Sequence, residues 1–374
     1  MRALLDRYRG DEFICVGDRR AFDAWSPEAP NARLVVVEQS VSPTQAAAAD
    51  GSRSISDMLA LTRAVHREAP DVFYSPSVYS YFPLPPGLPA VVTIHDTIAE
   101  RFPHLTLPTA RARLLWNLKV RLALFQARLV MTVSEHAARS IERVLGVPRD
   151  RIRVCVEAPA AAYQPADRAS IESAARKAAL PPGARWFCYV GGFNPHKRVD
   201  LILRAHAELA ATSGTEVHLV LVGTRTADVF HGEGDRLDAI VRDAGMAALV
   251  HWTGFMPDED LVPLVSGAVA SLLPSECEGF GLPAVEAAAC GTPVIATTES
   301  PLPELLEGGG LFVEPGNLDA LTGAMRRLLD DDITRDTMGR QALRKARALS
   351  WDRGADLVHA ALGEAAGQRE LRTT

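Results

Sequence analysis

Twelve short apolar runs, rich in valine and isoleucine, alternate with longer segments of helical periodicity along the chain. This alternation is typical of parallel sheets whose strands are joined by covering helices. The sequence therefore predicts an α/β protein with two sets of parallel strands. The first set lies at 13–16, 34–37, 72–75, 90–94, 129–133 and 152–156, and the second at 186–190, 217–222, 249–252, 269–273, 293–296 and 311–313.

The segment between the two sets, residues 157–184, is rich in Ala and Pro and reads as a connector with one helix. With 374 residues, the chain also exceeds the roughly 250–300 at which a single core stops growing. We expect a boundary near residue 160, which gives domains at 1–160 and 161–350 and a closing helix at 351–374. Because parallel sheets bind ligands beyond the carboxyl ends of their strands, a ligand cleft between the domains is the expectation.

Composition indicates a globular protein and argues against nucleic-acid binding and against a membrane-spanning segment. Hydrophobic residues make up 47% and charged residues 23%, as in ordinary globular proteins, and the net charge of −6 argues against nucleic-acid binding. The five cysteines are scattered without a CxxC pair, which favours reduced thiols in a cytoplasmic protein. No run approaches the roughly 18 apolar residues of a membrane span, so any membrane contact is expected to be peripheral.

The stretch "SECEGFGLPAVEAAACGTPVIA", residues 275–296, predicts a short helix ahead of a strand. Pro283 suits the first helical position, and Gly291 suits the position just after the helix. Gly279 and Gly281 precede the helix, so backbone N–H groups at its N-terminus can approach an anion.

Two glutamates, Glu278 and Glu286, accompany this anion site. Carboxylates only accept hydrogen bonds, so they suit sugar hydroxyls rather than phosphate. A nucleotide sugar carries both kinds of group. The alternative is that Glu286 complements the helix dipole while Glu278 is a solvated loop residue.

Two further stretches place polar residues at strand ends. In "CYVGGFNPHKRVDLILRAH", residues 188–206, Lys197 and Arg198 follow a strand and precede a helix, where they could meet a diphosphate or form a solvated basic turn. In "AVVTIHDTIAERFPHL", residues 90–105, His95 ends a strand, and Asp96 could cap the next turn.

Together these stretches resemble the retaining family-four glycosyltransferases. The stretch at 275–296 resembles the family's E-x7-E motif region, with Glu278 and Glu286 at its two glutamate positions. Further segments resemble the family in order: "VTIHDTIAERFP", "TVSEHAARSIERVLGVPRDRI", "YVGGFNPHKRVDLIL", "WTGFMPDEDL" and "LSWDRGADLVHAAL". The resemblance covers about residues 70–362 and implies the GT-B fold, two facing Rossmann-like domains with the last helix crossing back to the first.

The resemblance also implies roles for individual residues. Lys197, with Arg198 as a second cation, would neutralise the leaving diphosphate, and His95 would reach the transferred sugar. Glu278 would face that sugar, and Glu286 would bind the ribose hydroxyls. Backbone groups of four residues would contact the sugar and diphosphate: Gly279, Phe280, Gly281 and Leu282. No metal or other cofactor is expected, because a preorganised cation and a helix N-terminus can stabilise the leaving diphosphate. The acidic runs at 258–260 and 330–332 read as solvated or capping residues.

Two departures from the family pattern bear on activity. Gly192 stands where many members carry arginine, and the chain opens with a helix running into a strand rather than with the family's first strand and glycine-rich loop. The expected function is a retaining transfer of a hexose, mannose or similar, from GDP-mannose or a UDP-sugar to a glycan or lipid-linked acceptor in cell-surface polysaccharide or glycolipid assembly. The alternatives are a non-catalytic homologue that binds nucleotide sugar or steadies an active partner, and an epimerase or phosphorylase of the same architecture.

The segment between Glu100 and Glu135 contains no acidic residue. Its basic residues accompany Leu, Trp and Phe at helical spacing, which raises the hypothesis of a helix lying on an anionic membrane at the inner face of the cell membrane. The alternative is an ordinary packed helix. The basic residues are Arg101, Arg111, Arg113, Lys119, Arg121 and Arg128.

Overall fold

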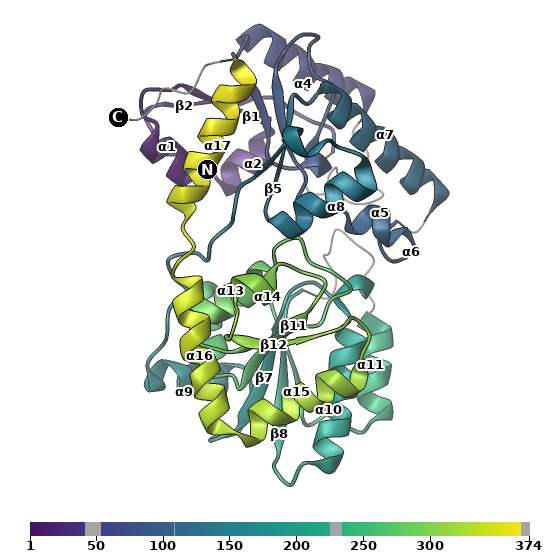
Figure 1. Ribbon diagram of the computed structural model, residues 1–374, viewed down its shortest axis with the longest axis vertical. Helices are drawn as coiled ribbons and strands as arrows, with labels where there is room; N and C mark the ends of the chain where they lie inside the picture. The colour runs from purple at the N-terminus through teal and green to yellow at the C-terminus, as the bar shows by residue number, and fades with distance from the viewer. Residues whose placement is uncertain (42–53, 108, 225–233, 368–374) are drawn as a thin grey trace. The chain divides into compact units, whose positions relative to one another are not determined.

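The computed structural model describes residues 1–41, 54–107, 109–224 and 234–367. The chain divides into two compact units, one formed by Met1–Val156 with Trp351–Thr374 and the other by Glu157–Ser350. Every strand in the described residues coincides with one of the apolar runs, to within about two residues at either end, and all strand pairs are parallel. The predicted α/β class is therefore confirmed (Figure 1).

The described residues of the first unit form two separate parallel sheets. Strands β1 (Phe13–Gly17) and β2 (Ala32–Val36) pair with each other, and the remaining strands form a sheet of order β3-β4-β5-β6. β4 and β5 are buried along their whole length, so this second sheet carries the core. Its strands are β3 (Phe73–Ser75), β4 (Ala90–Thr93), β5 (Leu129–Thr132) and β6 (Ile152–Val154).

The helices of the first unit follow the strands in alternation. As expected from the opening residues, a helix precedes the first strand. The α-helices are α1 (Arg2–Arg7), α2 (Arg19–Ala24), α4 (Ile55–Glu68), α5 (Ile98–Arg101), α6 (Pro103–Thr106), α7 (Ala110–Gln126), α8 (Glu135–Leu145) and α17 (Trp351–Ala366); η1 (Val78–Ser80) and η2 (Arg149–Arg151) are 3-10 turns.

The last helix, α17, packs in the first unit although it follows the whole second unit in the sequence. Ala361 and Ala365 lie in one buried cluster with Met131 of β5, and Figure 1 shows α17 beside α1. At the exposed side, Arg7 Nε donates to Asp356 Oδ1 at 2.7 Å. The final segment therefore closes the core of the first unit; its residues 368–374 lie outside the described part of the chain.

The second unit is built on one six-stranded sheet of order β12-β11-β10-β7-β8-β9. The strand order runs outward in both directions from the neighbouring pair β7 and β10. This pair is a topological switch point, and ligands bind beyond the carboxyl ends of such strands. The strands are β7 (Arg185–Val190), β8 (Val217–Val222), β9 (Val250–Gly254), β10 (Ala270–Leu273), β11 (Val294–Thr297) and β12 (Gly310–Val313).

The helices of the second unit connect these strands, and the predicted connector contains one of them, α9. No described helix of the chain is both long enough and apolar enough to cross a membrane. The helices are α9 (Arg168–Lys177), α10 (Val199–Thr212), α11 (Gly234–Asp243), α12 (Asp258–Ser266), α13 (Leu282–Ala289), α14 (Leu302–Leu305), α15 (Leu318–Asp330) and α16 (Asp332–Ala346), with the 3-10 turn η3 (Pro195–Lys197).

Candidate active site

The loops that leave β7 and β10 meet at the switch point of the second unit. The first loop carries Lys197 at the end of η3, and the second carries Glu278 just before α13. A backbone hydrogen bond joins the loops, because Glu276 N donates to the carbonyl of His196 at 2.8 Å. The parallel sheet thus brings together two segments about eighty residues apart in sequence.

Lys197 and Glu278 form an ion pair at this junction. Lys197 Nζ donates to Glu278 Oε1 at 2.8 Å, and Ser275 Oγ donates to the same oxygen at 2.6 Å. The Glu278 side chain is only 8% exposed, so removing either partner would leave polar groups in a poorly solvated place. Ser275 is a positioning residue that the sequence interpretation did not single out.

Arg198 does not share this ion pair. Its guanidinium contacts the carboxylates of Glu276 and Asp200, with Nε 3.2 Å from Asp200 Oδ1. Its backbone is left-handed, with φ of 54°, which costs a non-glycine residue about 1–2 kcal/mol. Arg198 therefore fastens the turn before α10 to the loop after β10.

The start of α13 is shaped by Gly281. This residue is left-handed, with φ of 84°, and a Cβ here would lie 2.8 Å from Leu302 Cδ1, so only glycine fits. No side chain caps the helix, and the Phe280 side chain is buried, which leaves backbone groups as what this turn can present to a ligand. The predicted helix is confirmed, with Pro283 at its second rather than its first position.

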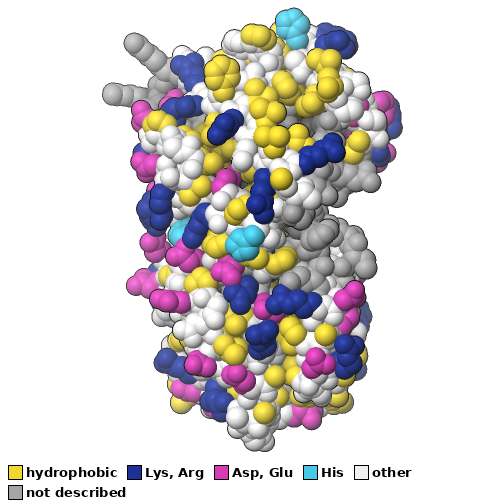
Figure 2. All heavy atoms as spheres, turned by 90° about the vertical axis from the view of Figure 1, so that its right-hand side faces the viewer, with side chains coloured by type: hydrophobic (Ala, Val, Ile, Leu, Met, Phe, Trp, Pro, Cys, Tyr) yellow, Lys and Arg dark blue, Asp and Glu magenta, His cyan; other side chains and the backbone are white. Residues whose placement is uncertain are grey.

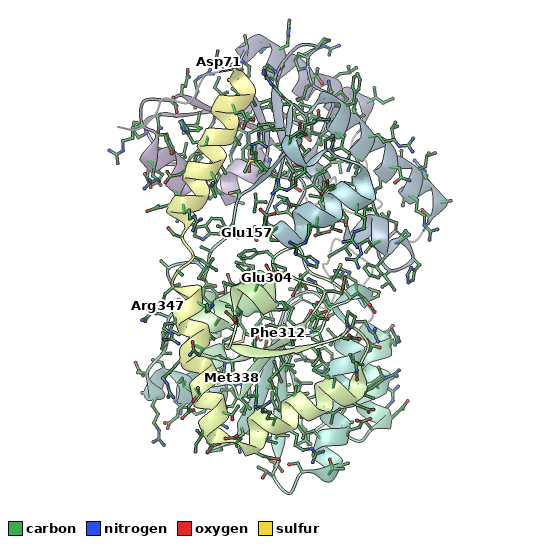
Figure 3. The ribbon with its side chains drawn as sticks, viewed as in Figure 1. Asp71, Glu157, Glu304, Phe312, Met338 and Arg347 are labelled. Carbon is green, nitrogen blue, oxygen red and sulfur yellow. The ribbon has the colours of Figure 1, made fainter. Side chains whose placement is uncertain are left out.

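Glu286 lies one turn into α13, where the charges that act on it are negative rather than positive. Burial, followed by the charges of Asp258 and Glu157, raises the pKa of Glu286 to about 7. Burial likewise raises the pKa of Glu157 to about 7. Glu157, labelled in Figure 3, is the first residue of this unit. Tyr163 donates its hydroxyl to Asp258 Oδ1 at 3.3 Å.

Sequence reasoning did not associate Asp258, Glu157 or Tyr163 with the site. The run at 258–260 forms the first turn of α12, where acidic residues complement the helix dipole, but none of its side chains caps the helix. What the pattern could not show is that this turn faces α13. Within the described residues, no three His, Cys, Asp or Glu side chains lie close enough together to hold a metal ion.

His95 belongs to the first unit, just beyond β4. Burial lowers its pKa, against the opposing charge of Asp96. Asp96 Oδ1 accepts from the backbone N–H of Ile98 at 2.9 Å, so this carboxylate caps the turn that begins α5. The structure thus joins Lys197 to Glu278, places Glu286 on the adjoining helix, and leaves His95 in the other unit.

Comparisons with known proteins identify the family of this chain. Two family descriptions match the chain, "Glycosyltransferase Family 4" over residues 5–155 and "Glycosyl transferases group 1" over residues 170–345. The O-antigen chain mannosyltransferase B of Escherichia coli is 30% identical over 282 residues, which cover 75% of this chain and 71% of that protein. The chain belongs to the family-four glycosyltransferases.

Other relatives show how far the likeness extends. The D-inositol 3-phosphate glycosyltransferase of Acidothermus cellulolyticus is 32% identical over 243 residues. These residues cover 63% of this family-four glycosyltransferase but only 53% of that protein. The structure of the Anabaena protein HepE in complex with UDP and glucose has a TM-score of 0.72 at 18% identity, covering 94% of this chain and 100% of HepE. At that identity the likeness shows the fold alone, and it confirms the predicted GT-B fold with two Rossmann-like domains.

Proposed function

We propose that this glycosyltransferase is a retaining, metal-independent hexosyltransferase. Its donor would be a nucleoside diphosphate hexose, GDP-mannose or a UDP-sugar, and its acceptor a glycan or lipid-linked sugar in cell-surface polysaccharide or glycolipid assembly. The observation that carries the proposal is the Lys197–Glu278 pair at the switch point, beside the uncapped start of α13. The likeness to an O-antigen mannosyltransferase supports the choice of mannose.

The leaving diphosphate gives Lys197 its role. When the bond between the anomeric carbon and the diphosphate oxygen breaks, its electron pair goes to the diphosphate, whose negative charge grows. A fixed ammonium and the backbone N–H groups of Gly281 and Leu282 stabilise that charge more in the transition state than in the bound donor. Arg198, the expected second cation, is paired with Glu276 and Asp200, so its part in the proposal is to hold this turn in place.

The carboxylates are assigned to hydroxyl groups. Glu278 would accept hydrogen bonds from the transferred sugar, together with backbone groups of Gly279 and Phe280. Glu286 would accept from the ribose hydroxyls, and His95 of the first unit would contribute to the sugar. The acceptor hydroxyl oxygen would attack the face that the diphosphate leaves, and its proton would pass to the departing diphosphate oxygen, so the anomeric configuration is retained.

The reaction would take place in the cytoplasm, at the inner face of the cell membrane. Nucleotide sugars are charged, water-soluble donors, whereas lipid-linked acceptors are confined to the bilayer surface. A transferase that uses both would profit from peripheral contact with anionic lipid. The scattered cysteines, which form no CxxC pair in the sequence, support the choice of a reducing compartment.

A donor screen tests the proposal. We expect GDP-mannose or a UDP-hexose to raise the melting temperature, because ligand at a hundred times its Kd stabilises the protein by about 2.7 kcal/mol. Incubation of that donor with lipid-linked or glycan acceptors in the presence of a chelator should then give product with the donor's anomeric configuration, read by NMR.

Other outcomes would contradict parts of the proposal. Donor binding without turnover across the acceptors would favour a non-catalytic homologue, and ring-opened or phosphate-released products would favour an epimerase or a phosphorylase. Inverted product would exclude retention. If no nucleotide sugar shifted the melting temperature, the donor assignment itself would fail.

A further inference from the structure

Helix α7 of the first unit is apolar on two opposite faces. Its inner face carries Ala112, Trp116, Val120 and Ala123, all buried, at the spacing of one helical stripe. Trp116 anchors this face, since its Nε1 donates to Glu100 Oε1 at 2.7 Å. The inner face thus holds the fully buried side chains by which α7 packs in its own unit.

The outer face of α7 also carries large apolar side chains. Leu114 is 68% exposed, Leu118 is 62% exposed and Phe125 is 86% exposed. Positions 114, 118, 121 and 125 are spaced by four, three and four residues, so they form a single stripe. A helix with two apolar faces is expected to have both covered, and nothing in the described chain covers this one.

Basic residues share this outer stripe. Arg111 precedes Leu114 by one turn and Arg121 lies between Leu118 and Phe125, and both are exposed. Figure 2 looks onto the side of the molecule that carries α7 in Figure 1, and there hydrophobic side chains gather with Lys and Arg side chains among them. The segment from Arg101 to Ser134 has no acidic residue, so the positive charge of the stripe is not neutralised along its own helix.

We propose that this outer stripe of α7, formed by Arg111, Leu114, Leu118, Arg121 and Phe125, docks on an anionic lipid surface. Leu114, Leu118 and Phe125 would enter the boundary between headgroups and acyl chains, and the two guanidinium groups would bind lipid phosphates. The purpose of this contact, access to a lipid-linked acceptor, rests on the proposed function; the contact itself needs neither donor nor turnover.

Charge favours a lipid surface over a second copy of the chain. In a symmetric dimer made through this stripe, the same basic residues would face each other, and like charges across an interface oppose association. An anionic bilayer offers complementary charge together with an apolar interior. One partner then binds both the basic and the apolar side chains of the stripe.

Vesicle flotation with the full chain tests the docking face. We expect binding to vesicles of phosphatidylglycerol and phosphatidylcholine, and little binding to phosphatidylcholine alone. Leu114→Ser with Phe125→Ser should weaken binding by about tenfold or more, since each loses a side chain buried in the bilayer. Arg111→Glu with Arg121→Glu should remove the preference for anionic lipid and its dependence on salt.

A matched control makes the same kinds of change elsewhere on the chain. Ile333 on α16 and Arg168 on α9 are also strongly exposed, and both lie in the second unit. Ile333→Ser with Arg168→Glu should bind vesicles as the unaltered chain does. Melting temperatures of all variants show whether each remains folded.

Three results would overturn the proposal. One is equal binding to neutral and anionic vesicles, and another is vesicle binding that the α7 variants do not weaken. The third is no vesicle binding together with a dimer, seen by light scattering, that dissociates when Leu114 and Phe125 are replaced. None of these results bears on donor binding, so the transferase proposal would stand or fall separately.

Discussion

The two glutamates of the motif occupy contrasting surroundings, although they lie on one short segment that ends in α13. Glu278 receives hydrogen bonds from an ammonium and a hydroxyl, and its side chain is nearly buried. Glu286 lies mostly out of water, and this burial, followed by the charges of Asp258 and Glu157, raises its pKa to about 7. The first carboxylate is neutralised by the protein, whereas the second is left for a ligand to satisfy.

This difference suits two different jobs. A carboxylate fixed by Lys197 is held in one position, as a group that must orient a reacting sugar requires. A carboxylate crowded by like charges gains more from accepting hydrogen bonds from ribose hydroxyls, because the free site stabilises its charge poorly. The predictions that follow test whether the two surroundings have these separate consequences.

The largest effect is expected from Lys197→Ala. Loss of a preorganised group that stabilises developing charge typically lowers kcat by about 100- to 1000-fold, and the change also leaves Glu278 without its cation. Transfer assays with the donor identified by the thermal screen measure this loss.

Lys177→Ala provides the matched control. Lys177 also forms an ion pair, with Asp260 at the start of α12, but its side chain is 55% exposed. We expect near-normal turnover from that variant. Similar losses from both replacements would mean that the Lys197 ammonium has no special part in the reaction.

Glu286→Gln should separate stability from binding. A carboxyl whose pKa rises from 4.5 to about 7 on folding binds more protons in the folded state, so stability falls as pH rises across that interval. The variant removes this loss and should be more stable than the unaltered chain at pH 8, by about 1 kcal/mol, with little difference at pH 4.5.

The same variant, Glu286→Gln, should bind the donor more weakly although it is more stable. Loss of the charged acceptor is expected to weaken nucleotide binding by about tenfold at pH 8, measured by calorimetry. Binding by the unaltered chain should strengthen as pH rises through 7, when Glu286 ionises, and binding by the variant should lack that pH dependence. A variant that is both less stable and equally tight would show that Glu286 has a purely structural role.

The smallest effect, a difference in stability, is expected at Arg198. Two replacements of this residue separate the contribution of backbone strain from that of charge pairing. Arg198→Gly and Arg198→Ala both remove the contacts with Glu276 and Asp200, but only glycine relaxes the left-handed backbone. The glycine variant should therefore be more stable than the alanine variant by about 0.5–1 kcal/mol in denaturant unfolding. Equal midpoints would mean that the backbone at this turn rearranges.

Local sequence patterns were sufficient for the elements of the fold. Each predicted strand run is a strand, because a buried parallel strand needs a continuous apolar run and little else. The short helix at 282–289 was equally predictable, since proline near its start and Gly291 after its end are local chemistry. The resemblance to a known family added the arrangement of these elements into a GT-B fold.

The composition of α7 could be read from the sequence, but not the direction of its side chains. Trp116 and Leu114 are apolar residues two positions apart in this helix, yet Trp116 is buried and Leu114 is exposed. Only packing against the sheet of the first unit decides which stripe faces inward. The docking proposal therefore depends on the tertiary structure, although its basic residues were visible from the start.

The sequence by itself determined the strands and the glycine turn, because these depend on neighbours within a few positions. It also showed which residues are charged. The tertiary structure decided which charges meet. Strand order places the end of β7 beside the end of β10, which gives Glu278 a lysine partner from another loop. Helix packing places Asp258 near Glu286 instead. Charges interact through space, so two glutamates eight positions apart acquired opposite environments from the same fold.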